Sequence, residues 1–255
     1  MSRVHVWLLT AALALCTGCD RLSGLSELSF EYCGDKTVTL CSDFDRGAVD
    51  RGWTQNLEGD AAKISSDPAL AVSPPRSMRS TAPSNGRARL VYRMPANVLS
   101  STLSLSIDAR PSAFAEKHIS LAEFVCCNEM PCDGIYLRVV SRPDGPHLAF
   151  WRGYNPDPKA TEPAKGISIF EDPNPVQPGF QDASISVTWT EPIARYTVTL
   201  NGEGPAGAQD APDLCALRKV DLQANIGVSV VTTVLSPAVA YYDNVQLHLE
   251  TPDSR

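Results

Sequence analysis

The chain has 255 residues, and its 29 acidic side chains outnumber its 22 basic ones, which gives a formal net charge of −7 at pH 7. Nucleic-acid binding depends on clustered lysines and arginines, and the sequence holds no such cluster, so we expect no nucleic-acid partner. Beyond the first twenty residues, no apolar stretch reaches the roughly 18 residues typical of a membrane-spanning helix.

The first twenty residues have the order of an export signal. A positive charge at Arg3 precedes an apolar run at 4–15, and two small residues at 17–18 precede Cys19. That run is too short for a membrane helix, which takes about 20 residues. The small residues before a cysteine resemble a bacterial lipobox, with Cys16 where that motif usually has Leu. The resemblance implies cleavage before Cys19 and lipidation of its sulfur atom.

These features divide the chain into four parts. We expect a lipoprotein signal peptide at 1–18, a lipidated polar tether at 19–32, a β-sandwich domain at 33–250 and a C-terminal tail at 251–255. The mature protein would be held by its lipid to a bacterial membrane. It would lie in the cell envelope, on the periplasmic face or the outer surface.

The exported region reads as a series of short strands, because apolar and polar residues alternate along it. No segment shows a helical period over ten residues. Short strands rich in Val, Ile, Thr and Tyr predict an all-β fold, an antiparallel sandwich. About eleven strands are expected, at residues 38–44, 87–93, 103–107, 118–126, 135–140, 147–152, 165–170, 185–189, 196–200, 226–230 and 239–249.

Local features add detail to this pattern. Asn201 and Gly202 predict a tight turn. Trp189 shares the parity of the apolar residues in its strand and is expected in the core, whereas Trp53 is expected beside the first strand. Six prolines occur in the stretch 153–182. Such a stretch is either a functional loop or a rigid segment that covers a sheet edge.

A candidate binding surface lies on the predicted hairpin around residues 141–146. In a symmetric register Tyr136 lies opposite Trp151, and Arg138 lies on the same face. Aromatic rings stack on the apolar faces of sugars, and arginine donates hydrogen bonds to hydroxyl or carboxylate groups. Tyr154 follows just beyond the hairpin. Ordinary cross-strand packing of Tyr136 and Trp151 is the alternative interpretation.

Six cysteines remain once the signal is removed and Cys19 is lipidated. An even number in an exported chain indicates disulfides; the six are Cys33, Cys41, Cys126, Cys127, Cys132 and Cys215. Cys33 and Cys41 are the expected pair, because the seven residues between them can form a short closed loop. The other four would form two further bridges.

The adjacent Cys126 and Cys127 are not expected to bond to each other. Neighbouring Cα atoms lie about 3.8 Å apart, which is below the usual disulfide range. A metal site formed by these cysteines, Cys132 and His118 is an alternative to disulfides. The spacing matches no common zinc pattern, in which the cysteines are two to four residues apart.

Three short segments resemble the jelly-roll sandwiches of concanavalin-like lectins and carbohydrate-binding modules. They are Cys-Ser-Asp-Phe-Asp-Arg-Gly at 41–47 with Gly52-Trp53 behind it, Val-Ser-Pro-Pro-Arg-Ser-Met at 72–78, and Tyr-Tyr-Asp-Asn-Val-Gln-Leu at 241–247. The likeness covers about 210 residues and implies a jelly roll without a specific ligand. Similar chains are often uncharacterised lipoproteins of Gram-negative bacteria.

The resemblance also implies a structural calcium, because acidic residues on the neighbouring first and last strands of such folds often hold one. Asp43 or Asp45 and Asp243 match those positions. In the last strand Asp243 shares the parity of the apolar residues and is expected to face them. A buried carboxylate needs a partner, which can be calcium or backbone hydrogen bonds. A bulge that turns Asp243 outward is the third alternative. No other cofactor is expected.

The sequence lacks the motifs of several enzyme classes. There is no Glu-x-Asp-x-x-Glu around Glu123, no Gly-x-Ser-x-Gly elbow and no glycine-rich phosphate loop. Tyr136, Arg138 and His147 could meet on one face, as the Tyr, His and Arg of polysaccharide lyases do. We therefore predict a non-catalytic envelope protein with a glycan as the favoured ligand. The alternatives are a protein that holds another envelope protein and a polysaccharide lyase.

Overall fold

The computed structural model divides the chain into two units, Met1–Lys36 and Thr37–Arg255. The whole first unit lies outside the described residues, and so do the expected signal peptide, Cys19 and the tether. The structure describes residues 39–45, 48–94, 102–113, 119–127, 132–155, 165–190, 193–211, 214, 221–230 and 236–250.

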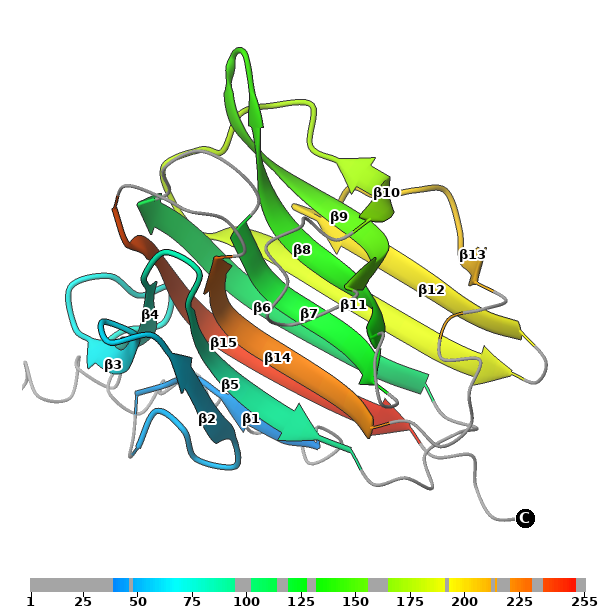
Figure 1. Cartoon of the computed structure of the whole chain (residues 1–255). Helices are drawn as coiled ribbons and strands as arrows, with labels where there is room; N and C mark the ends of the chain where they lie inside the picture. Colours follow the sequence, from blue (N-terminus) through cyan, green and yellow to red (C-terminus); the bar gives the residue numbers. More distant parts are fainter. Residues whose placement is uncertain are drawn as a thin grey trace, which may run out of the picture. The chain divides into compact units, whose positions relative to one another are not determined.

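The described residues form two antiparallel sheets and no helix (Figure 1). One sheet has eight strands, in the spatial order β13 (Gln209–Ala211), β12 (Ile193–Leu200), β11 (Gln181–Thr190), β6 (Thr102–Ala113), β15 (Ala238–Glu250), β4 (Ser77–Ala82) and β3 (Lys63–Asp67), with β1 (Leu40–Ser42) paired to β15. The other has seven, in the order β10 (Lys165–Glu171), β9 (Gly145–Asn155), β8 (Cys132–Arg142), β7 (Ile119–Cys127), β14 (Asp221–Val230), β5 (Arg87–Arg93) and β2 (Thr54–Glu58).

This arrangement confirms the predicted antiparallel sandwich and raises the number of strands to fifteen in the described part of the chain. All eleven predicted strands are present. The four that were not predicted are β2, β3, β4 and β13, whose sequences are short and polar. Three of these four are the last strand at an edge of their sheet, where one side of the backbone faces no neighbour and little apolar surface is needed. Across the described residues, no helix has the length and apolar character to span a membrane.

The inner faces of the two sheets form one hydrophobic core. Leu105 and Ile185 come from the eight-stranded sheet, and Leu137 and Phe150 come from the other; all four are at most 2 % exposed. Tyr242 adds a polar connection, because its hydroxyl donates to the carbonyl of Leu121 on the opposite sheet at 3.0 Å. The shared core fixes the outer face of the seven-stranded sheet, which carries the candidate site.

Both tryptophan predictions and the turn prediction are confirmed. Trp189 is 9 % exposed in the core. Trp53 is buried, and its Nε1 donates to Ser42 Oγ on β1 at 3.1 Å. Asn201 and Gly202 both have positive φ angles, 52° and 80°, in the turn after β12.

The last strand departs from its predicted alternation. Tyr242 faces the core before Asp243, and Val245 faces it afterwards, so the inward parity changes between them. The register to β6 shifts between Asp243 and Gln246, and Asn244 has a φ of 48°. This is a β-bulge, which inserts one extra residue into a strand. The expectation that Asp243 faces the apolar core is wrong, and the bulge that turns it outward is observed.

Cys41 and Cys126 are disulfide-bonded. Their partners are not among the described side chains, because Cys33 and Cys215 lie outside the described residues and the side chains of Cys127 and Cys132 are not described. The pairing therefore stays a prediction. A disulfide-bonded Cys126 cannot act as a thiolate ligand, which counts against the zinc alternative that also involved His118.

Candidate functional site

The β8–β9 hairpin has the register that alternation predicted. Tyr136 pairs with Trp151, Arg138 pairs with Ala149, and the pairing continues without a shift to the turn after Arg142. The residues between these positions point into the core. The seven-stranded sheet is the nearer one in Figure 1, with the hairpin extending beyond it. The predicted Tyr136–Arg138–Trp151 group therefore forms on the outer face.

Strand pairing aligns two rows of side chains across this outer face. The first row runs from β2 to β10 through Thr54, Val91, Asn225, Glu123, Tyr136, Trp151 and Ser168. The second row runs in the same direction through Glu58, Arg87, Ser229, Ser120, Arg138, Ala149 and Glu171. We call the two rows together the outer-face site.

A buried ion pair lies near the middle of the outer-face site. Arg89 donates to Glu123 Oε2 at 2.6 Å, and Asn225 Nδ2 donates to the same oxygen at 3.2 Å. The Arg89 and Glu123 side chains are 11 % and 9 % exposed. Burial alone would raise the pKa of Glu123, but Arg89, Asn225, Arg87 and Ser120 outweigh it and the pKa is lowered. Glu123 is therefore a charged structural partner.

Beside this pair, Tyr136, Arg138 and Trp151 form a stack. The guanidinium carbon of Arg138 lies 4.6 Å from the Tyr136 ring centre and 6.0 Å from that of Trp151, within the range of a cation–π contact. Tyr136 is 2 % exposed and Arg138 is 5 % exposed. The Tyr136 hydroxyl lies over Gly134, where an added Cβ would come within 3.2 Å of it. A glycine at this position leaves room for the ring.

Burial raises the pKa of Tyr136, with a further contribution from Glu123, so its hydroxyl stays protonated. Trp151 is half-buried, which leaves part of its ring open to a ligand. Tyr154 pairs through its backbone with Asp133 and Lys165, and its side chain is not described. The structure thus brings three of the four predicted ligand residues together.

Several buried polar atoms of this face have no hydrogen-bond partner among the described residues. They include the hydroxyl of Tyr136, Oδ1 of Asn225, Oγ of Ser229 and Nε of Arg89. An unmet buried donor or acceptor costs about 1–3 kcal/mol. These atoms are enclosed by the protein, so they form a polar layer beneath the outer face.

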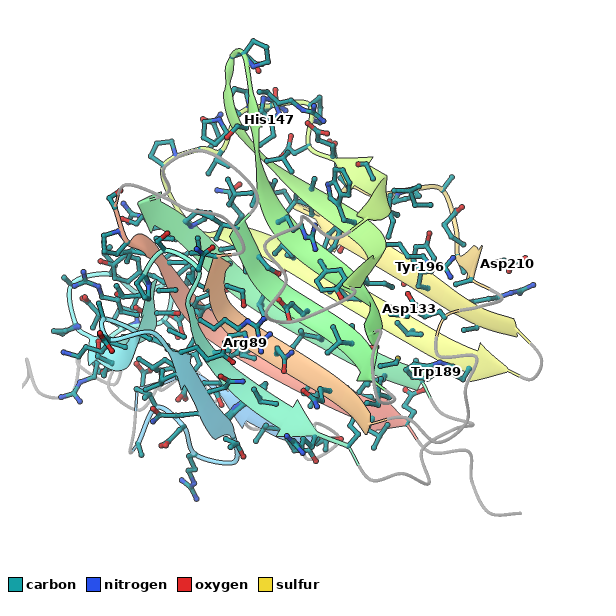
Figure 2. The ribbon with its side chains drawn as sticks, in the orientation of Figure 1. Arg89, Asp133, His147, Trp189, Tyr196 and Asp210 are labelled. Carbon is teal, nitrogen blue, oxygen red and sulfur yellow. The ribbon has the colours of Figure 1, made fainter. Side chains whose placement is uncertain are left out.

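His147 is engaged elsewhere. Its Nδ1 lies 2.8 Å from the carbonyl oxygen of Asp172, and its Nε2 lies 3.1 Å from Asp144 Oδ1. Figure 2 shows it near the tip of the hairpin, well separated from Arg89. Burial would lower the pKa of His147, but these contacts outweigh it and the pKa is raised. Both ring nitrogens thus take part in holding the hairpin turn.

The proline-rich stretch contributes to that contact. Beyond β10, Asp172 N donates to the carbonyl of Leu148 at 2.9 Å, and Val176 N donates to that of Pro146 at 2.7 Å. This part of the stretch therefore continues along the edge of β9, as the edge-covering alternative predicted. Residues 156–164 lie outside the described residues.

An open hollow of about 300 Å³ lies at the β2 end of the outer-face site. It was missed because β2 reads as a polar loop in the sequence. Its lining is rich in amide side chains: Thr54, Gln55, Asn56, Leu57, Val91, Arg93 and Gln223.

The carboxylate of Asp243 lies in a set of hydrogen bonds. Val72 N and Ser73 N donate to its Oδ2 at 2.7 and 2.9 Å, while Ser73 Oγ and Asn244 N donate to Oδ1 at 3.1 and 2.9 Å. Burial raises the pKa of Asp243, and these bonds offset part of the rise. The backbone hydrogen bonds that the sequence left as an alternative to calcium are present.

The other two calcium candidates also accept backbone hydrogen bonds. Asp45 Oδ1 accepts from Arg76 N at 2.8 Å, and Asp43 Oδ1 accepts from Asp45 N at 3.2 Å. Within the described ranges, no group of three His, Cys, Asp or Glu side chains could hold a metal ion. Calcium binding through Asp43, Asp45 and Asp243 stays a prediction.

Comparison with known proteins identifies a fold class. No family model and no curated protein match the sequence. Among solved structures, an alginate lyase from Chlorella virus superposes with a TM-score of 0.54 at 11 % identity, over 83 % of this chain and 99 % of the other. A family 7 alginate lyase in complex with substrate gives 0.54 at 12 % identity, over 82 % and 97 %.

A carbohydrate esterase from a Shiga toxin-encoding bacteriophage gives a TM-score of 0.52 at 8 % identity, over 78 % of this chain and 91 % of its own. At such identities the likeness shows the fold alone. It places the chain among two-sheet jelly rolls, as the sequence resemblance implied. The structural neighbours include proteins that act on glycans.

Proposed function

We propose that this protein binds a polysaccharide on the outer-face site without cleaving it, and that a lipid on Cys19 holds it in the cell envelope. The observation that carries the proposal is the stack of Tyr136, Arg138 and Trp151 on the outer face, in which the Arg138 guanidinium contacts both rings and forms no ion pair with a described residue. Sugar hydroxyl and carboxylate groups accept hydrogen bonds, and a guanidinium donates them. The half-buried Trp151 supplies an apolar surface for a sugar ring.

Three features of the site favour binding over catalysis. A general base must reach the proton that it removes, but both nitrogens of His147 are engaged at the hairpin turn. Tyr136 has a raised pKa, and a phenolate there is disfavoured. Glu123 is occupied by Arg89 and Asn225. These observations count against the lyase alternative built on Tyr136, Arg138 and His147.

A glycan array probed with the secreted domain tests the proposal. We expect binding to at least one polysaccharide, and we expect Trp151→Ala to weaken it by about tenfold, equivalent to about 1.4 kcal/mol. Ile167→Ala is the matched control, because Ile167 is 64 % exposed on the adjacent β10 and lies outside the two rows.

Thermal melting of both variants separates lost binding from lost folding. Absence of binding to every glycan would overturn the proposal and favour a protein partner instead. Release of unsaturated oligosaccharides from a bound polysaccharide would show that the protein is a lyase.

A further inference from the structure

The outer-face site holds an arginine without a counterion. Two other arginines of this face are paired, Arg87 with Glu58 at 3.3 Å and Arg89 with Glu123 at 2.6 Å. Arg138 forms no hydrogen bond or ion pair with any described residue; its contacts are with the rings of Tyr136 and Trp151. One buried positive charge of the site therefore has no ion-pair partner among the described residues.

Such a charge is unfavourable unless a partner compensates it. Transfer of an ion out of water carries a large penalty, which paired charges and hydrogen bonds offset. Burial lowers the pKa of Arg138, in agreement with an unfavourable environment for its charge. The charge of Glu123 offsets part of this effect, but its carboxylate accepts hydrogen bonds from Arg89 and Asn225 and forms none with Arg138.

The guanidinium of Arg138 is nevertheless reachable. Nε of Arg89 is fully enclosed, but none of the Arg138 nitrogens is among the enclosed unpartnered atoms. The contacts with the rings of Tyr136 and Trp151 orient its planar group. A planar, oriented guanidinium matches a carboxylate, which it can bind through two parallel hydrogen bonds.

We propose that Arg138 selects the charge of the ligand and that the bound polysaccharide is a polyuronate whose carboxylate group lies against its guanidinium. This inference rests on the proposed glycan binding and adds a ligand class to it. The overall charge of −7 does not oppose it, because the selection is made by one local cation rather than by the net field.

The test compares uronate oligosaccharides with their methyl esters, which keep the sugar backbone and remove the charge. Calorimetric titration with oligomers of alginate, polygalacturonate and glucuronan should reveal at least one acid form that binds about 10- to 100-fold more tightly than its ester, the range expected for a charge-assisted hydrogen-bonded pair. Arg138→Gln should remove this difference. Arg195→Gln should leave it unchanged, because Arg195 lies on the other sheet, more than half exposed and paired with Asp210.

A second variant distinguishes a loss of ligand binding from a loss of folding. Arg138→Met keeps an unbranched side chain over Tyr136 and removes a buried charge that has no ion-pair partner, so its melting temperature should not fall below that of the unmodified protein. It should lose the rise in melting temperature that an acidic oligomer gives the unmodified protein. A lower melting temperature for Arg138→Met would assign Arg138 a structural role and overturn the inference.

The outcomes separate the two proposals. Equal affinity for acid and ester forms, or binding to neutral glycans alone, overturns the selection by Arg138 while glycan binding stands. Absence of binding to any glycan overturns the proposed function itself, and the inference falls with it.

Discussion

Glu123 keeps its charge in a buried position because Arg89 and Asn225 donate to the same oxygen. Its pKa is lowered from the ordinary 4.5, so its ionised form stabilises the fold. That stabilisation is complete above pH 4.5 and is lost as the pH falls through the lower value of the folded state.

Glu123→Gln tests this account. At pH 7 the substitution leaves Arg89 buried and unpaired, and the free energy of unfolding should fall by about 3 kcal/mol. The gap between the two proteins should narrow as the pH falls below 4.5, because protonation removes the same charge from the unmodified protein. Urea denaturation at a series of pH values measures both effects. A gap that is independent of pH would show that Glu123 is not ionised in the fold.

Asp243 shows how a single residue connects two distant segments. Its carboxylate accepts from the backbone of Val72 and Ser73 and from Asn244. An amide at this position cannot accept with both atoms, so Asp243→Asn leaves donors unpaired and should lower the free energy of unfolding by about 1–3 kcal/mol. Denaturation with and without a chelator completes the test. If hydrogen bonds alone stabilise the segment, the chelator will not change the stability of the unmodified protein; a loss would establish structural calcium.

At the scale of elements, the sequence predicted strands best where side chains alternate and pack on the core. The β8–β9 hairpin is the clearest case, since its alternation set both the faces and the pairing of Tyr136 with Trp151. The strands β2, β3 and β4 carry mostly polar residues, and their sequences gave no such pattern. In β4 the buried Ser80 replaces apolar contact with hydrogen bonds, donating to the carbonyl of Ala88 and accepting from Val228 N.

The bulge in β15 could not be predicted from the sequence for a different reason. One inserted residue changes which side chains face the core, and an alternation count across Asp243 has no means of locating it. The signal that could have found it is Asp-Asn within an apolar strand, because asparagine tolerates the positive φ that such an irregularity requires. Mutations on either side of the bulge must therefore be interpreted with opposite parity.

The sequence predicted which residues of the candidate site share a face, but it did not predict how deeply they are buried or which other side chains surround them. Alternation placed Tyr136 and Arg138 opposite the core, which for most sheets means facing solvent. Both are nonetheless buried, and strand alternation has no means of predicting that. The paired arrangement of Arg89 with Glu123 joins β5 and β7, which are distant in sequence, so only the sheet order brings it about.

At the scale of the whole molecule, the seven-stranded sheet has two differently used faces. One packs against the other sheet through an apolar core, and the other carries the buried ion pair and the polar atoms without partners. The apolar core keeps the backbone of β7, β8 and β14 in place, so the outer-face side chains are free of a packing role against the other sheet and available for the proposed binding. Many jelly rolls can combine an apolar inner face with a variable outer face, so the function of each one depends on the residues of its own site and not on the fold.

The proposed anchoring concerns the whole chain and is tested in a bacterial host. Cleavage before Cys19 and acylation should give a membrane-associated protein whose first residue is a lipidated cysteine. Cys19→Ser removes the sulfur atom that carries the lipid, and the protein should then lack that lipid and leave the membrane fraction. Mass spectrometry of the amino terminus and detergent partition of both proteins measure these outcomes. Cys16→Leu is the matched control, because it replaces the other cysteine of this region with the residue that a lipobox usually has there, and it should keep the lipid. An unprocessed amino terminus in the unmodified protein would contradict the anchor.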